Sequence, residues 1–433
     1  MKKKLRTIFV WVLVSLLLQF GAYSYLENKV AQVVMPNEPS GPITKELQAT
    51  IPGTEFENIQ VSYAKDYLAY TENGTLKIFN LKKEKIVFEK KTNDKSLGVL
   101  SYQWLPDRDT LLYFYAKKNP NPVTYVTVPI KPTTPTVDTK TDQKTDTKID
   151  PKVEDPNQKP AKTVDKVEQK ETPVQTKTEV RYNNPQITEL YTLELPGSDE
   201  DTEPDDRFNQ TINEFPAGGK IDELVFSTST NLIYLTVKDG SKELLMEIDV
   251  MKNVRTLNRT GEIVDGMAAS DRYGTLYINS KIGGTKQVVS LGVGNRHVIS
   301  KNANDKVLGI RDGKIYIGEV INNELVKIKT TEDRSEISDN PSLKTEWEGS
   351  IPLSEVSILI GSQGEVVIYN QQTAYIIKSG ELNEISLKGD ENYISDDGAE
   401  LIELKKSGTS TLVELQALNP KESGIVTNSF HLE

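Results

Sequence analysis

The sequence predicts an all-β protein: a single β-propeller of about seven four-stranded blades behind an N-terminal transmembrane helix. Short strand-like runs are separated by turn dipeptides along most of the 433 residues. These runs recur in units of roughly 40–45 residues, the length of propeller blades and of WD40-like repeats. A basic start followed by a long apolar run predicts the helix. Six to eight blades fit the spacing, and the propeller is expected over residues 51–433.

The N-terminal segment has the charge pattern of a signal-anchor. Residues 1–7 form a basic tip with Lys2, Lys3, Lys4 and Arg6, and residues 8–26 are almost uninterruptedly apolar. A helix rises about 1.5 Å per residue, so roughly 19 residues cross a hydrocarbon core of about 30 Å. The basic flank stays in the cytoplasm, which makes the protein single-pass with its bulk extracellular. A cleaved signal peptide remains the alternative, because residues 22–24 (Ala-Tyr-Ser) are a passable cleavage motif.

Composition limits the compartment and the partners. The formal net charge is −11, which argues against nucleic acid as a partner for the bulk of the chain. Cysteine is absent, so an exported domain must be stabilised by burial and sheet pairing without disulfides, which fits a Gram-positive cell surface. With two histidines and no cysteine, the chain lacks the ligands of a structural zinc site.

Two segments outside the repeats differ in composition. Residues 27–50 contain Pro36, Pro39 and Pro42 and are predicted to form a stalk. Residues 117–181 are rich in Lys, Asp, Thr and Pro, with almost no aromatic residue after Tyr125. Such a segment cannot bury enough apolar surface to offset its backbone entropy, so a disordered insertion is predicted there.

Turn dipeptides define the blades. A β-hairpin is predicted wherever Asn-Gly, Asp-Gly, Gly-Gly or Asn-Asn separates two β-like runs. Blade one is expected at 51–91 and blade two at 95–217, split by the insertion; later blades start near 218, 259, 303, 350 and 389. Each sheet has two apolar faces and is covered only by stacking on its neighbours in a closed ring. Tandem β-sandwiches are the alternative architecture. The dipeptides are Asn73-Gly74, Asp239-Gly240, Gly283-Gly284, Asp312-Gly313 and Asn322-Asn323.

One blade carries a family resemblance. Residues 101–118 read SYQWLPDRDTLLYFYAKK, with Trp104 ending a strand, Pro106-Asp107 in a turn and Tyr113 on the returning strand. Proline presets the backbone for such a turn and aspartate bonds to it. The pattern resembles TolB-type propellers and the propeller domain of dipeptidyl peptidase IV, with Leu105 and Arg108 at the family's serine and glycine. Residues 270–274 and 395–399 are weaker echoes. The resemblance implies the fold only, without the hydrolase domain of those peptidases.

Two charged segments of the sequence are candidate binding sites. The acidic residues at 199–206 lack the calcium-loop register and are interpreted as a solvated loop; the same holds for Asp390, Glu391, Asp396 and Asp397. The basic patch at 82–91 is interpreted as lysines that guard strand edges. Its binding to an anionic cell wall or lipid headgroups is the alternative. The charged residues are Asp199, Glu200, Asp201, Glu203, Asp205 and Asp206, and Lys82, Lys83, Lys85, Lys90 and Lys91.

No catalytic, cofactor-binding or metal-binding residue is predicted. His297 is expected at the surface and His431 at a frayed end. The spacing at 361–364 does not match a nucleophile elbow. Large aromatics at equivalent places on the strands are expected to pack between blades. They are Tyr70, Trp104, Tyr113, Tyr234, Tyr277, Tyr316 and Tyr369.

These observations predict a non-catalytic binding or scaffold module at the cell envelope. Its partners would be the cytoplasmic membrane, through the N-terminal helix, and an envelope protein or cell-wall polymer. The alternative is a cell-surface hydrolase or lyase with carboxylates in the central channel, which should meet there with raised pKa values. A sensor that signals through its short cytoplasmic tip is a third hypothesis.

Overall fold

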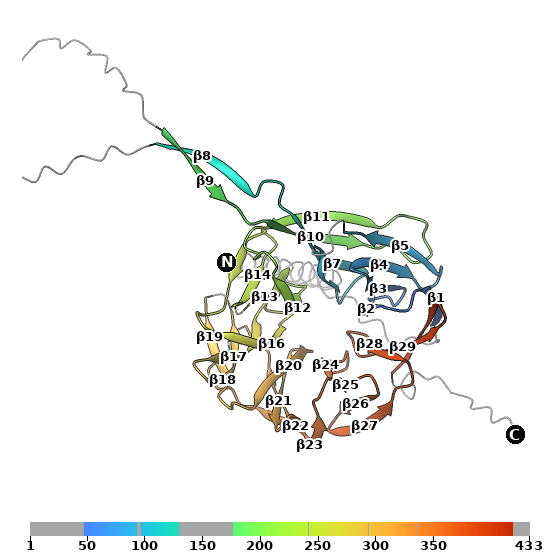
Figure 1. Cartoon of the computed structure of the whole chain (residues 1–433). Helices are drawn as coiled ribbons and strands as arrows, with labels where there is room; N and C mark the ends of the chain where they lie inside the picture. Colours follow the sequence, from blue (N-terminus) through green and yellow to red (C-terminus); the bar gives the residue numbers. More distant parts are fainter. Residues whose placement is uncertain are drawn as a thin grey trace, which may run out of the picture. The chain divides into compact units, whose positions relative to one another are not determined.

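The computed structural model describes residues 47–92, 97–129, 176–240, 242–292, 294–335 and 337–418. The regular structure in these ranges is β throughout: seven four-stranded sheets and one two-stranded ribbon. The seven sheets form a seven-bladed propeller, as predicted (Figure 1). The chain divides into two compact units, and residues 119–185 form the smaller one. The propeller is described first and by itself.

Six blades use four strands in chain order. The first strands of successive blades contact one another, so they lie innermost around the axis. Blade 1 comprises β2 (Glu57–Val61), β3 (Tyr67–Glu72), β4 (Thr75–Asn80) and β5 (Lys85–Lys90). Blade 2 comprises β6 (Gly98–Trp104), β7 (Thr110–Lys118), β10 (Gln186–Glu194) and β11 (Asp205–Ile212). Blade 3 comprises β12 (Lys220–Ser227), β13 (Leu232–Asp239), β14 (Lys242–Ile248) and β15 (Val254–Thr256). Blade 4 comprises β16 (Ile263–Ala269), β17 (Leu276–Ile282), β18 (Thr285–Leu291) and β19 (Arg296–Ser300). Blade 5 comprises β20 (Asp305–Arg311), β21 (Lys314–Ile321), β22 (Glu324–Glu332) and β23 (Lys344–Pro352). Blade 6 comprises β24 (Ser357–Ile360), β25 (Val366–Tyr369), β26 (Thr373–Lys378) and β27 (Glu381–Ser386).

Blade 7 closes the ring with strands from both ends of the described chain. It consists of β28 (Glu391–Ile394), β29 (Glu400–Ser407), β30 (Ser410–Ala417) and β1 (Leu47–Pro52). β1 pairs antiparallel with β30, with Leu47 opposite Leu415. The predicted boundary at residue 51 was therefore wrong, because residues 47–50 belong to this strand. Alternate residues of β1, Ala49 and Ile51, are buried against blade 1. Two alternating apolar residues are too few for the sequence alone to distinguish this strand from a stalk.

The innermost strands share a local irregularity. In blades 1–5 the pairing register shifts near the start of the first strand, as at a β-bulge. A bulge adds one residue, bends the strand and increases its twist. The same distortion therefore recurs where the blades converge.

The core lies between neighbouring blades. Trp104 is 3% exposed, packs with residues of blades 1 and 2, and donates its indole N–H to the Gln60 carbonyl oxygen at 3.3 Å. Six of the seven aromatics named above are buried, and Tyr369 is partly buried. Face-to-face stacking of closed four-stranded sheets excludes the tandem β-sandwich alternative.

Strand direction gives the propeller two distinct faces. Successive strands of a blade run antiparallel, so the connections from first to second and third to fourth strand emerge on one side, here called the front face. The remaining connections emerge on the back face. Leu47 pairs with Leu415 at the end of β30, and the Leu418 N–H donates to the Ala399 carbonyl oxygen in the β28–β29 turn. Both ends of the described propeller chain therefore lie at the front face.

The smaller unit is an antiparallel ribbon of β8 (Val123–Pro129) and β9 (Thr176–Tyr182). It corrects the disorder predicted for residues 117–181. Lys117 and Lys118 lie in β7, and both flanks of the insertion are strands. Alternating Val, Thr and Tyr residues favour a pleated strand despite the surrounding polar composition. The rest of the predicted insertion, residues 130–175, lies outside the described residues.

The predicted tip (1–7), anchor (8–26), first part of the stalk (27–46) and His431 also lie outside the described residues. Across the described ranges, no helix has the length and apolar character needed to cross a membrane.

Candidate binding face

Front-face turns connect neighbouring blades. Asp397 lies in the β28–β29 turn, one of the sequence echoes, and Glu400 is the first residue of β29. Both contact Lys65 of blade 1, whose ammonium nitrogen lies 2.7 Å from Asp397 Oδ2 and 2.9 Å from Glu400 Oε2. The Lys65 and Glu400 side chains are 6% and 0% exposed. Burial opposes the charged form, yet the Lys65 ammonium lowers the pKa of Asp397. This cluster joins the last blade to the first beside the ring closure.

Two further turns make similar contacts. The Ala64 N–H of blade 1 donates to Asp109 Oδ1 of blade 2 at 2.8 Å. The Thr228 N–H of blade 3 donates to Asp271 Oδ1 of blade 4 at 2.9 Å, in the other sequence echo. The turns that carry the family resemblance therefore fasten blades together, which explains their residues without a ligand.

The basic patch and the acidic loop face each other. Lys83 Nζ donates to the Glu200 carbonyl oxygen at 2.6 Å and to Asp201 Oδ1 at 2.9 Å. Lys90 Nζ lies 2.9 Å from Asp206 Oδ2. A hollow of about 410 Å³ remains between the third-to-fourth-strand turn of blade 1 and the β10–β11 loop. The acidic residues were predicted to form a solvated loop and the lysines to guard strand edges, and the structure pairs the two segments.

Three further hollows follow one another across the front of blades 4, 5 and 6. Their volumes are about 690, 510 and 210 Å³. The first and second share Arg334, Ile337 and Ser338. The second and third share Lys314, Thr330 and Glu346. Because each hollow continues into the next, we treat the three as one feature, the front groove.

The loop at residues 333–343, between β22 and β23, forms the middle of the front groove. Asp333 is buried and accepts hydrogen bonds from Ser270 Oγ at 2.5 Å and Tyr277 Oη at 2.8 Å, both in blade 4. Ile337 is buried in the core between blades 4 and 5. The Asn340 N–H donates to the Val298 carbonyl oxygen at 2.7 Å. The loop therefore bridges from blade 5 to blade 4 and is fixed at both ends and in the middle.

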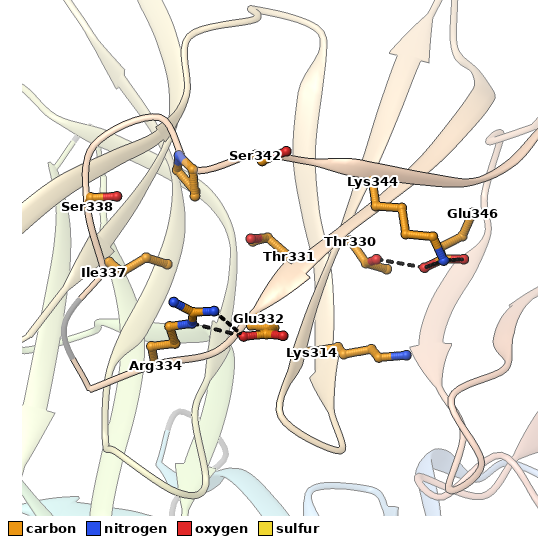
Figure 2. A pocket seen from close by; sticks show the side chains of 11 residues that line it. Lys314, Thr330, Thr331, Glu332, Arg334, Ile337, Ser338, Ser342, Lys344 and Glu346 are labelled. Atoms are coloured by element: carbon orange, nitrogen blue, oxygen red, sulfur yellow. Dashed lines mark hydrogen bonds and ion pairs between the residues drawn. The ribbon is translucent and has the colours of Figure 1, made fainter.

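Charged side chains flank the second hollow (Figure 2). Arg334 Nε donates to Glu332 Oε2 at 2.9 Å on one side. On the other, Lys344 Nζ lies 3.0 Å from Glu346 Oε1, which also accepts from Thr330 Oγ1 at 3.0 Å. Thr331 also lines this hollow (Figure 2). Lysine contact lowers the pKa of Glu346, so this carboxyl is ionised at neutral pH.

His297 lies at the blade 4 end of the groove. Its side chain is 36% exposed, and its Nδ1 lies 3.6 Å from Asp339 Oδ1. It was predicted to be a surface residue, and it lines the first hollow.

A cluster of carboxylates lies near the back-face ends of β12, β14 and β16. Burial, followed by the charges of Asp222, Asp265 and Glu243, raises the pKa of Glu223 to about 7. Lys238 Nζ lies 2.5 Å from Asp222 Oδ2 and Lys306 Nζ lies 3.4 Å from Asp265 Oδ2. Across the described ranges, no group of three His, Asp or Glu residues is placed to hold a metal ion.

Comparison with known proteins supports nothing beyond the fold. No protein-family profile matches the sequence. No curated protein matches it either. Among solved structures, the chain is similar to the Cps50 (Swd1) β-propeller domain of Myceliophteria thermophila: 11% identity, TM-score 0.48, covering 86% of this chain and 100% of that one. A Dos1 propeller gives 10% identity and a TM-score of 0.43, covering 85% and 79%.

Peptidases with propeller domains are also among the similar structures. An acylaminoacyl peptidase of Pyrococcus horikoshii gives 11% identity and a TM-score of 0.39, covering 82% of this chain and 50% of that chain. These values indicate likeness in fold, in line with the TolB-type and dipeptidyl peptidase resemblance of residues 101–118. They carry no argument about activity.

Sequence reasoning did not find the front groove. The one available signal was length: 11 residues join β22 to β23, whereas two residues join β26 to β27 at the same place in the next blade. Which side chains line the hollows depends on where blades 4 and 6 lie, and no local pattern encodes this.

Proposed function

We propose that this protein is a membrane-anchored extracytoplasmic propeller that acts as a non-catalytic binding module at the cell envelope, with the front face as its binding surface. The observation that supports this most is the placement of the hollows. The four described above open on the front face, and three of them join into a groove across three blades. A rigid scaffold that displays loops on one side is a common basis for binding.

The anchor follows from the basic tip and the apolar run at residues 8–26. Because β1 begins at the front face, residues 27–46 would connect the anchor to that face. A chain of 20 residues spans at most about 70 Å. The binding face would therefore work within this distance of the membrane, where envelope polymers and membrane-proximal proteins are found.

Two measurements test this proposal. The intact mass of the protein extracted from membranes should correspond to an uncleaved chain, and a species that begins near Tyr25 would contradict the anchor. The detergent-solubilised full-length protein should also co-sediment with purified envelope material, saturably and without consuming it. Failure to co-sediment with any envelope fraction would contradict the binding module.

The carboxylates around Glu223 favour a second candidate function, a hydrolase or lyase of extracellular polymers. A carboxyl with a pKa of about 7 can hold or release a proton at neutral pH. This candidate predicts that incubation with envelope polysaccharide releases new reducing ends, and that Glu223→Gln abolishes the release. Equal release by wild type and variant would exclude Glu223 as the acid or base.

A further inference from the structure

We propose that the front groove binds a linear, hydroxyl-rich polyanion: a chain of sugars or polyols that carries carboxylate or phosphate groups. The inference rests on the proposed function, since it names the ligand class of the same face. The inference goes beyond the proposed function because it places the binding site at the front of blades 4–6 and assigns ligand recognition to particular side chains.

The shape of the groove favours a long, thin ligand. The three hollows run in sequence over three blades and share lining residues at each junction. A compact cofactor would occupy one hollow and leave the others empty. A polymer can occupy all three, with successive repeat units in successive hollows.

The walls of the groove suit hydroxyl groups. Hydroxyl and amide side chains both donate and accept hydrogen bonds, which matches the mixed demand of a polyol. They come from blade 4 and from the loop and strands of blade 5. Among them are Thr275, Ser290, Asn295, Thr331, Ser338 and Ser342.

The charges of the groove favour an anion. Among the residues that the structure describes, four cationic side chains line the three hollows, Lys314, Arg334, Lys344 and Lys378, against two carboxylates. Both carboxylates, Glu332 and Glu346, already have cationic partners. The Lys314 side chain makes no hydrogen bond or ion pair with another described residue, although its charge acts on Glu346. The described lining of the groove therefore has an excess of positive charge available to a ligand.

The net charge of the whole chain, −11, does not prevent this. At physiological ionic strength, charges farther than about 8 Å are largely screened. A ligand lying in the groove would respond mainly to the lysines and arginine that it contacts. The predicted exclusion of nucleic acid concerned the bulk of the protein and left a local site of this kind open.

The groove is also preorganised. Asp333 and Ile337 are buried, and the Val298 N–H donates to Asp339 Oδ1 at 2.8 Å, so the loop that shapes the second hollow is held against blade 4. A site fixed before binding loses little conformational entropy when a ligand arrives.

The test measures binding of three polymers of similar length to the full-length protein in detergent: poly(glycerol phosphate), polygalacturonate and neutral dextran. We expect at least one polyanion to bind and dextran to bind weakly or not at all. Lys314→Met and Lys344→Met should each raise the Kd about threefold, and the double variant should raise it about tenfold. Lys286→Met, which replaces another exposed lysine, near the start of β18 on the back face, is the matched control.

The outcomes separate this inference from the proposed function. Binding of only one polyanion identifies phosphate or carboxylate as the recognised group. Equal Kd values for wild type and double variant, or a stronger effect of Lys286→Met, would overturn the site. If the protein prefers dextran to both polyanions, or binds none of the three polymers, a hydroxyl-rich polyanion is not the ligand. In both cases, co-sedimentation with the envelope tests the binding module separately.

Discussion

Lys83 Nζ donates a hydrogen bond of 2.9 Å to Asp201 Oδ1, although the two residues are 118 positions apart in the sequence. Lys83 follows the third strand of blade 1, and Asp201 lies in the β10–β11 loop of blade 2. Together with Lys90 and Asp206, they join a basic and an acidic segment that look unrelated along the chain. Lysines that have such partners inside the molecule are less available to an external polyanion than Lys314.

Trp104→Ala should destabilise the propeller by about 3–5 kcal/mol, as truncation of a buried aromatic does. The ring is 3% exposed between blades 1 and 2, and its N–H is hydrogen-bonded. Denaturant unfolding followed by tryptophan-independent far-UV circular dichroism measures the change, with Trp104→Phe as a milder control. Wild-type stability combined with loss of envelope binding would instead make Trp104 part of a binding site.

Lys65→Met should destabilise the protein by about 3–5 kcal/mol, because it leaves Asp397 and Glu400 buried without a cation. The double variant Lys65→Met, Glu400→Gln should recover part of this loss. Thermal unfolding of the three proteins at one pH provides the comparison. If the single variant matches wild type, the cluster does not hold the ring closed.

Glu223→Gln should stabilise the protein at pH 8 and have little effect at pH 4.5. The pKa of Glu223 is raised from 4.5 to about 7 in the folded protein, so between these values the folded state binds more protons than the unfolded state. Stability then falls as pH rises through this window, and the wild-type deficit is complete above pH 7. It should be on the order of 1–3 kcal/mol. Urea unfolding at several pH values tests this, and a variant effect that does not depend on pH would contradict the shift.

Replacing residues 130–175 by Asn-Gly should leave the melting temperature of the propeller almost unchanged. Pro129 and Thr176 are cross-strand partners at the end of the ribbon, so a two-residue turn can join them. Long surface insertions cost little to shorten. Calorimetry of the shortened and full-length proteins gives the answer. A drop of many degrees would mean that the propeller core depends on the insertion.

The sequence was informative where local chemistry determines geometry. Asn73 and Gly74 have φ values of 51° and 73°, the left-handed pair that a tight hairpin needs, and the dipeptide alone predicted it. Repetition of such turns at blade length was enough to predict the propeller. In contrast, β1 pairs with a strand more than 350 residues away, since Leu47 lies opposite Leu415. No local pattern could reveal that pairing.

The candidate site was less predictable than the fold, because its residues come from separate blades. Thr275, Lys314 and Lys344 are ordinary polar residues beside turns or strand ends, and none belongs to a motif. Asp333 likewise looks like one more surface acid until Tyr277 and Ser270 are seen to hold it. Such sites arise from how blades pack, whereas sequence periodicity reports only which residues each blade buries.

The central claim, that the front face binds the envelope, can be tested by blocking one face at a time. The chain has no cysteine, so Ser342→Cys in the front groove and Lys286→Cys on the back face each provide a single labelling site, both exposed. Each variant would be coupled to a bulky maleimide-polyethylene glycol, and its co-sedimentation with purified envelope would be compared with that of the unlabelled protein. We predict that labelling at residue 342 abolishes binding and labelling at residue 286 leaves it intact. Undiminished binding after labelling at 342, or loss only after labelling at 286, would contradict the account.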